Sequence, residues 1–140
     1  MRDLVTSIHP LRAISPQSVS DNTALTSQII DKQGYDSLTF VIATGSLADA
    51  DATFAVSVEH GDQANLSDAA VAAAADLIGT IAEANFTFAD DDETRKIGYQ
   101  GAKRYVRIKI TPANNSGAAN LAAVAVLGHP HIAPTPGVPV

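Results

Sequence analysis

Several groups of residues carry side chains that can bind ions or transfer protons. An acidic run extends from Asp90 to Glu93, and carboxylate oxygens are ligands that Ca²⁺ prefers. Asp49 and Asp51 are candidates to add further oxygens. The run lacks the spaced ligands and the fixed glycine of a dedicated calcium loop. A solvated hairpin loop is therefore the simpler interpretation, and calcium binding stays open.

Histidine supplies the other candidate chemistry. His129 and His131 lie two residues apart, so in an extended chain both project to the same side. A metal site needs three or four ligands, and no carboxylate nearby in the sequence completes one. Residues 59–62, Glu-His-Gly-Asp, place an acid beside a base, but no activated nucleophile or oxyanion hole is recognisable. The sequence predicts no catalytic residue, no metal, no cofactor and no enzymatic activity.

One strand carries residues typical of a binding face. Tyr105, Arg107 and Lys109 alternate with apolar residues over residues 104–111, so they share one side of an extended chain. Tyr and Arg are common anchors of protein interfaces. Charged residues on an exposed strand also block unwanted pairing between sheet edges. We treat the three residues as an interface candidate, with this second interpretation left open.

Composition excludes several classes of function. The 140 residues suit one domain, and the absence of cysteine removes disulfides and thiolate metal sites. A net charge of -6 argues against nucleic acid or an anionic membrane as partner. No apolar run approaches the ~20 residues of a membrane span. The first residues have prolines and charges where a signal peptide is apolar, so we expect a protein made in the cytosol.

Turn residues separate a series of short apolar segments. We predict strands over residues 23–31, 37–44, 53–59, 77–81, 84–88, 95–98, 104–111 and 121–127. Residues 67–75 indicate a loop with one or two helical turns. The last strand, 121–127, is apolar on both faces, which predicts a central strand covered on both sides. The expected fold is all-β, an antiparallel β-sandwich or jelly roll.

Proline-rich ends flank this domain. We predict an N-terminal arm over residues 1–22, a sandwich over 23–128 and a C-terminal arm over 129–140, because proline cannot join the interior of a sheet. Extended arms are either disordered or ordered on neighbouring subunits. The apolar arm residues form a second interface candidate: Leu4, Ile8, Leu11, Ile132 and Val138.

Segments 34–43, 52–62, 97–107 and 123–130 resemble small proteins encoded in the head-gene clusters of tailed bacteriophages and prophages. The resemblance runs from about residue 27 to 134, and its motifs are structural rather than catalytic. It implies a virion component made in the host bacterial cytoplasm. The most specific expectation is a head decoration (cement) protein on the capsid surface. Such a protein binds the major capsid protein across its joints and copies of itself, as a trimer.

Two alternatives to decoration remain. One is a head–tail connector or a tail accessory subunit, to which the resemblance applies equally. The other is a carbohydrate-binding jelly-roll module on the virion. Carbohydrate-binding modules usually present aromatic platforms, whereas this chain has no Trp and only 3 Tyr.

Overall fold

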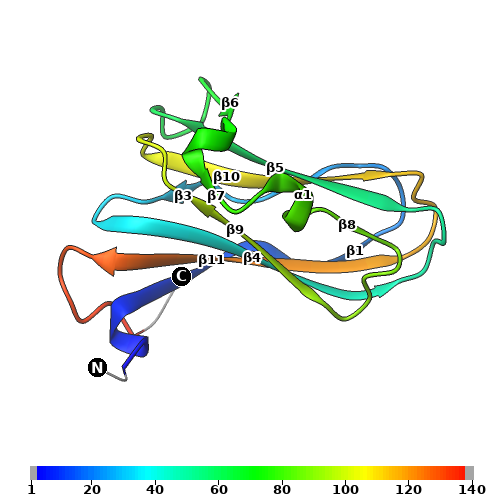
Figure 1. The fold of residues 1–140 in the computed structure, drawn as a ribbon, viewed down its shortest axis with the longest axis horizontal. Coiled ribbons are helices and arrows are strands. Elements are labelled where there is room, and N and C mark those ends of the chain that lie inside the picture. Colours follow the sequence, from blue (N-terminus) through cyan, green and yellow to red (C-terminus); the bar gives the residue numbers. More distant parts are fainter. Residues whose placement is uncertain (1–2, 138–140) are drawn as a thin grey trace.

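Two antiparallel sheets face one another in the computed structural model, which describes residues 3–137 (Figure 1). Sheet A has the order β1 (Ile8–Val19), β11 (Ala119–Pro130), β4 (Tyr35–Leu47), β9 (Thr94–Tyr99) and β7 (Leu77–Ile78). Sheet B joins β2 (Leu25–Thr26), β3 (Ile30–Asp31), β10 (Tyr105–Ala113), β5 (Thr53–Gly61), β6 (Ala70–Val71) and β8 (Phe86–Thr87). The short helical segments are η1 (Val5–Ser7), η2 (Ala74–Asp76) and α1 (Ile81–Ala84).

The strand order is that of a jelly roll. The first and last strands, β1 and β11, pair along sheet A, while β10 pairs with β5 in sheet B. Each sheet thus takes strands from both halves of the chain, as two interlocked Greek keys require. The predicted all-β sandwich is confirmed. Within residues 3–137, no helix has the length and apolar composition needed to cross a membrane.

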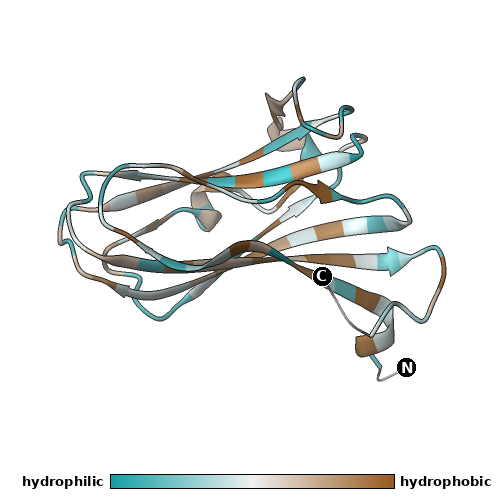
Figure 2. Cartoon of the chain, turned by 180° about the vertical axis from the view of Figure 1, so that it is seen from behind, coloured by the Kyte–Doolittle hydropathy of each residue, from teal (hydrophilic) through white to brown (hydrophobic). Residues whose placement is uncertain are grey.

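The core lies between the sheets and consists mainly of aliphatic side chains. Along β10 the burial alternates strictly, so the predicted apolar side of that strand is the inner side. Phe54 and Phe86 stack with ring centroids 4.7 Å apart, which joins β5 to β8. Figure 2 shows apolar and polar bands alternating along the strands. The most deeply buried large side chains include Leu38, Phe40, Ile42, Tyr99, Val106, Ile108 and Ile110.

The predicted N-terminal arm over residues 1–22 is wrong for most of its length. Residues 8–19 form β1, which pairs with β11 from Ile8 opposite Gly128 to Val19 opposite Ala119. An edge strand tolerates proline because one side of it has no ladder partner. Pro16 also lies in an irregular stretch of the register, between Ile14 and Gln17. The prolines therefore mark an edge strand rather than a free arm.

The C-terminal arm begins later than predicted. β11 continues through His129 to Pro130, which pairs with Tyr35, so the boundary at residue 128 is wrong by two positions. Residues 131–137 then fold back onto the N-terminal segment. The Thr135 amide donates to the Thr6 carbonyl at 3.0 Å. Both described ends therefore lie at one corner of the molecule, beside sheet A (Figure 1).

Two predicted strands are mostly replaced by other structure. Of residues 77–81, only the first two form a strand, and α1 begins directly afterwards. The Thr80 side chain accepts a hydrogen bond from the Glu83 amide at 3.1 Å, which caps this helical turn. Of residues 84–88, only Phe86 and Thr87 pair, with β5. Local capping here overrides the apolar pattern that predicted strands.

Acid is expected to destabilise the fold. The Arg104 guanidinium holds the pKa of Asp31 below its ordinary value, and the Thr87 amide, with a smaller effect of Arg95, lowers that of Asp90. Lowered carboxyl pKa values stabilise the fold above the unfolded value of about 4 and lose this effect as the pH falls through the folded values. Thermal melts should show a falling Tm between about pH 4 and 2. Asp90→Asn should flatten the dependence, whereas a constant Tm would contradict it.

Candidate interaction surface

The acidic run is engaged in structural contacts. Asp90 pairs with the Arg95 guanidinium at 2.9 Å, and Asp91 accepts a hydrogen bond from the Leu47 amide at 3.2 Å. Asp49 binds the amide and hydroxyl of Ser116 at 2.6 and 2.9 Å. Within residues 3–137, no group of three or more His, Cys, Asp or Glu is placed to hold a metal ion. These carboxylates connect the loops at one end of the sandwich.

The histidine candidates are directed to separate partners. His129 Nδ1 lies 2.9 Å from Ser37 Oγ, and His131 Nε2 lies 2.7 Å from Asp36 Oδ1. His60 Nδ1 lies 2.7 Å from the hydroxyl of Tyr99, a side chain whose pKa is raised by burial. Its sequence neighbour Glu59 instead forms an ion pair on the opposite face. The structure therefore does not bring the acid and the base of residues 59–62 together.

The predicted interface strand face lies on the outer side of sheet B. Arg107 Nε lies 2.8 Å from Glu59 Oε1, and both side chains are largely covered. The Arg104 guanidinium lies 5.0 Å above the Tyr105 ring and also pairs with Asp31. Arg107 and Tyr105 are thus satisfied within the chain. A partner for the face formed by Tyr105, Arg107 and Lys109 stays a prediction.

The sheet edges offer little to an added strand. Among the described strands, β1 is the long edge of sheet A, and it carries Pro10, Pro16 and two register shifts. The other edge of that sheet, β7, has two residues. Prolines, irregular register and short length all oppose the pairing of another chain with an edge. A face is therefore a better candidate for binding than an edge.

The outer face of sheet A is apolar along its central strand, β11, and only partly covered. Along β11, buried Leu121, Ala123 and Ala125 alternate with partly exposed residues that are also small and apolar. An antiparallel sheet whose face meets water normally carries polar residues there. The prediction of a central strand is confirmed, since β11 lies between β1 and β4. The predicted second cover is absent from the described chain, because Val124 is 40% exposed.

This surface, called the A face, comprises the outward residues of four strands. They are Ile8, Pro10 and Arg12 of β1; Ala122, Val124, Val126 and Gly128 of β11; Ser37, Thr39, Val41 and Ala43 of β4; and Thr94, Lys96 and Gly98 of β9. Directly paired residues of neighbouring strands project to the same side of a sheet. Small side chains predominate, so the surface is open to close approach by a partner.

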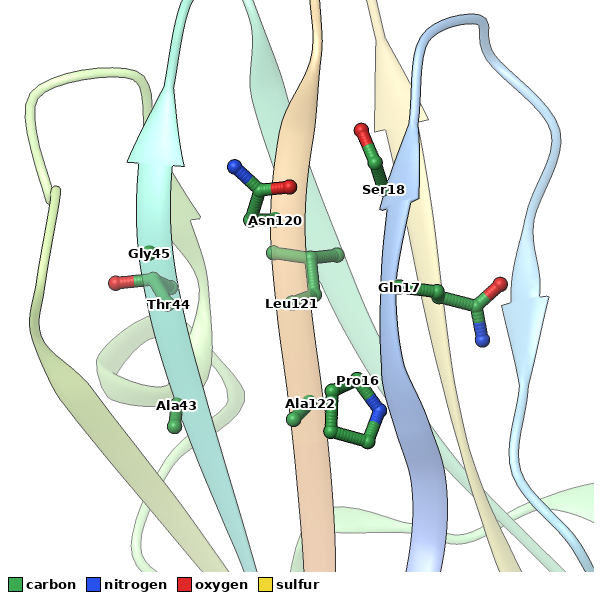
Figure 3. Close-up of a pocket in the computed structure, with 9 residues that line it drawn as sticks. All are labelled: Pro16, Gln17, Ser18, Ala43, Thr44, Gly45, Asn120, Leu121 and Ala122. Carbon is green, nitrogen blue, oxygen red and sulfur yellow. The ribbon is translucent and has the colours of Figure 1, made fainter.

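Hollows interrupt the A face. A groove of about 590 Å³ at the terminal corner is lined by Leu4, Ile8, Thr39 and Val126, among others. A second hollow, of about 410 Å³, also touches Thr39 and extends to Ile78 on β7. A third, of about 460 Å³, is lined by small residues that include Ala43, Gly45 and Ala122 (Figure 3). The two hollows that share Thr39 extend the A face from the terminal corner to β7.

Most of the predicted arm residues gather at the terminal corner. Leu4 and Ile132 are 67% and 84% exposed there, and Ile8 lines the groove. Leu11 lies elsewhere, in β1 opposite Ala125, where it packs against the core, and its role at an interface stays a prediction. Val138 lies outside the described residues. The sequence analysis missed the A face itself, although segments 40–43 and 121–127 are apolar on both sides, which is the signal for it.

Removing the C-terminal segment tests how far the corner supports the fold. Deleting residues 131–140 leaves β11 intact. Among the described residues it removes few contacts, chiefly those of His131 with Gly34 and Asp36 and of Thr135 with Thr6 and Ile8. A few hydrogen bonds at 0.5–1.5 kcal/mol each suggest a loss of about 1–3 kcal/mol in the free energy of unfolding. Circular dichroism and thermal melts should show a folded chain with a slightly lower Tm. Aggregation of the truncated chain would place this segment in the core.

Comparison with known proteins gives structural neighbours only. No protein-family model matches the chain, and no curated protein matches it. The whole chain superposes on 42% of the PBSX exported protein XepA, with a TM-score of 0.58 and 14% identity. The chain therefore spans less than half of that protein. At this level of identity the similarity shows the fold alone.

Two further neighbours are more distant. The SPBc2 prophage-derived protein YomS matches over 89% of this chain and 99% of its own, with a TM-score of 0.48 and 11% identity. A Clostridium thermocellum xylanase 10B containing CBM22-1 and GH10 modules matches over 87% of this chain and 25% of its own, with a TM-score of 0.48 and 12% identity.

Proposed function

We propose that this chain is a structural protein of a bacteriophage virion, where it decorates the capsid by binding across joints between major capsid proteins. The observation that supports the proposal best is the A face. The centre of the A face is apolar and only partly covered. The outer face of sheet B instead carries charged side chains that pair with one another, such as Arg107 and Glu59. Exposed apolar patches of this kind are typical of surfaces that bind another protein. In this role the chain binds and does not catalyse.

Weak contacts suffice for this function when many copies act together. Partial burial of Val41, Val124 and Val126 contributes at most about 1.5–3 kcal/mol for each side chain. Sites repeated on a lattice convert modest contacts into stable attachment, since bound subunits hold their neighbours in place. Leu4 and Ile132, at the corner beside the A face, add a second contact region. A subunit that contacts both sides of a joint opposes separation under the pressure of packaged DNA.

Copy number in purified particles tests the decoration role. Quantitative mass spectrometry should find dozens to hundreds of copies relative to the major capsid protein, as a lattice of decorated joints requires. A ring of about six or twelve copies would instead indicate a connector or tail subunit, because such subunits follow cyclic symmetry. Absence from the particle would contradict every virion role.

Particle stability supplies the functional readout. Particles assembled without this chain should release DNA at a lower temperature, and adding the purified chain should restore the original temperature. Unchanged release would remove the stabilising role even if the chain is present on the particle. A glycan array tests the carbohydrate-binding alternative. Specific hits there, with no binding to shells, would replace the proposal.

A further inference from the structure

One row of paired residues crosses the A face from edge to edge. Arg12 on β1 is opposite Val124 on β11, Val124 is opposite Val41 on β4, and Val41 is opposite Lys96 on β9. Paired residues share one side of the sheet, so a cation stands at each end with two valines between. Three strand spacings of about 4.8 Å separate the two end positions, which gives about 14 Å.

The strand residues of the A face carry charge of one sign only. Among its described strand residues, Arg12 and Lys96 are the charged ones. The nearby carboxylates of Asp3 and Glu83 line the hollows from outside these strands, and Asp3 already accepts from the amide and hydroxyl of Thr6. Within residues 3–137 neither Arg12 nor Lys96 forms an ion pair. This contrasts with a chain whose net charge is -6.

This arrangement disfavours a second copy of the chain as the cover. Two identical faces that pack together are related by a two-fold axis in the plane of contact. An axis along the strands places Arg12 over the other copy's Lys96, and an axis along the row places each cation over its own equivalent. Like charges brought together in an interface cost several kcal/mol. With the axis through the centre of the row, neither arrangement makes the A face complementary to itself.

We infer that the A face binds a protein surface of opposite pattern: small apolar side chains flanked by two carboxylates about 14 Å apart. The valines supply buried apolar area, and the cations fix the orientation of the partner. This chain is acidic overall and therefore repels an acidic partner. The two cations make the A face the surface of the chain that such a partner can approach. The identification of the partner as a capsid protein rests on the proposed function. The charge pattern expected of the partner does not rest on it.

Charge reversal on the A face tests the inferred charge pattern, with a matched control variant. Binding is measured to shells of the major capsid protein from the virus that encodes the chain. Arg12→Glu/Lys96→Glu should weaken co-sedimentation with shells at least tenfold. The control, Lys32→Glu/Lys103→Glu, makes the same change in charge away from the A face and should bind normally. Loss of binding by the control alone, or normal binding by the A-face variant, would overturn the inference. Failure of the wild-type chain to bind shells would contradict the decoration role instead.

A mixing experiment is independent of any virion role. The Arg12→Glu/Lys96→Glu variant itself presents an apolar face with two carboxylates at the required spacing, so it serves as the partner probe. Sedimentation velocity at low salt should show a complex in the mixture that neither protein forms alone, and this complex should dissociate in high salt. A wild-type dimer lost on Val124→Glu would make a second copy the occupant and overturn the inference. A mixture that associates no more than its components would overturn it as well.

Discussion

Under the proposed decoration role, replacing Val124 with glutamate should abolish attachment to capsid shells while leaving the isolated chain folded. Val124 lies at the centre of the A face and is 40% exposed, so a glutamate there stays hydrated in the free chain. Surface substitutions of this kind usually change the free energy of unfolding by no more than about 0.5 kcal/mol. On a bound partner the carboxylate loses its water, and pairing with the neighbouring Arg12 withdraws that cation from the partner. Burying this pair of charges costs at least about 2 kcal/mol. We expect affinity to fall at least about 30-fold.

The control is the same substitution on the other sheet. Val71 on β6 is 67% exposed, and Val71→Glu should leave shell binding unchanged. Co-sedimentation measures binding for both variants, and thermal melts verify that both are folded. Normal binding by folded Val124→Glu would exclude the A face as the attachment surface. Loss of shell binding by Val71→Glu alone would indicate that the attachment surface lies on sheet B.

Truncation of Phe40 to alanine should produce the largest loss of stability. Its side chain is 0% exposed in the centre of β4, between Ala125 on β11 and Ile97 on β9. The small neighbour Ala125 cannot fill the space that the ring leaves. Phe→Ala changes in cores cost about 3–5 kcal/mol, a large part of the 5–15 kcal/mol that stabilises a typical domain. We expect Tm to fall by about 10 °C or more.

The adjacent residue provides the comparison. Val41 points out of the sheet, so Val41→Thr should change the free energy of unfolding by less than about 0.5 kcal/mol. Urea unfolding of both variants compares how much the inner and the outer side of β4 contribute to the free energy of unfolding. A small effect of Phe40→Ala, or an equal effect of both substitutions, would contradict the assignment of inner and outer sides in β4.

Alternation predicted the main strands correctly where the two sides of a strand differ. The strand at 104–111 is the best example, since its charged side faces out and its aliphatic side faces in. β1 was missed because Pro10 and Pro16 resemble the signature of a loop, and only the topology reveals that this strand lies at an edge. The helical turn α1 was missed because its capping by Thr80 is a local effect that competes with an apolar pattern.

The candidate surface was predicted only in part, for a physical reason. A strand that is apolar on both sides must be covered on both sides, and the sequence of residues 121–127 shows this requirement. It does not show whether the second cover comes from the same chain or from another molecule. The row from Arg12 to Lys96 is equally hidden, because these residues come from four strands whose register exists only in the folded sheet.

The position of β11 makes sheet A depend on one strand. It is the last of the described strands along the chain, yet it fills the place between β1 and β4. A chain that stops before residue 119 leaves β1 detached and the edge of β4 open, a state prone to aggregation. Such a chain also lacks Ala122, Val124 and Val126, which form the middle of the A face. A chain truncated before residue 119 is therefore expected to lose the order of sheet A and the A face together.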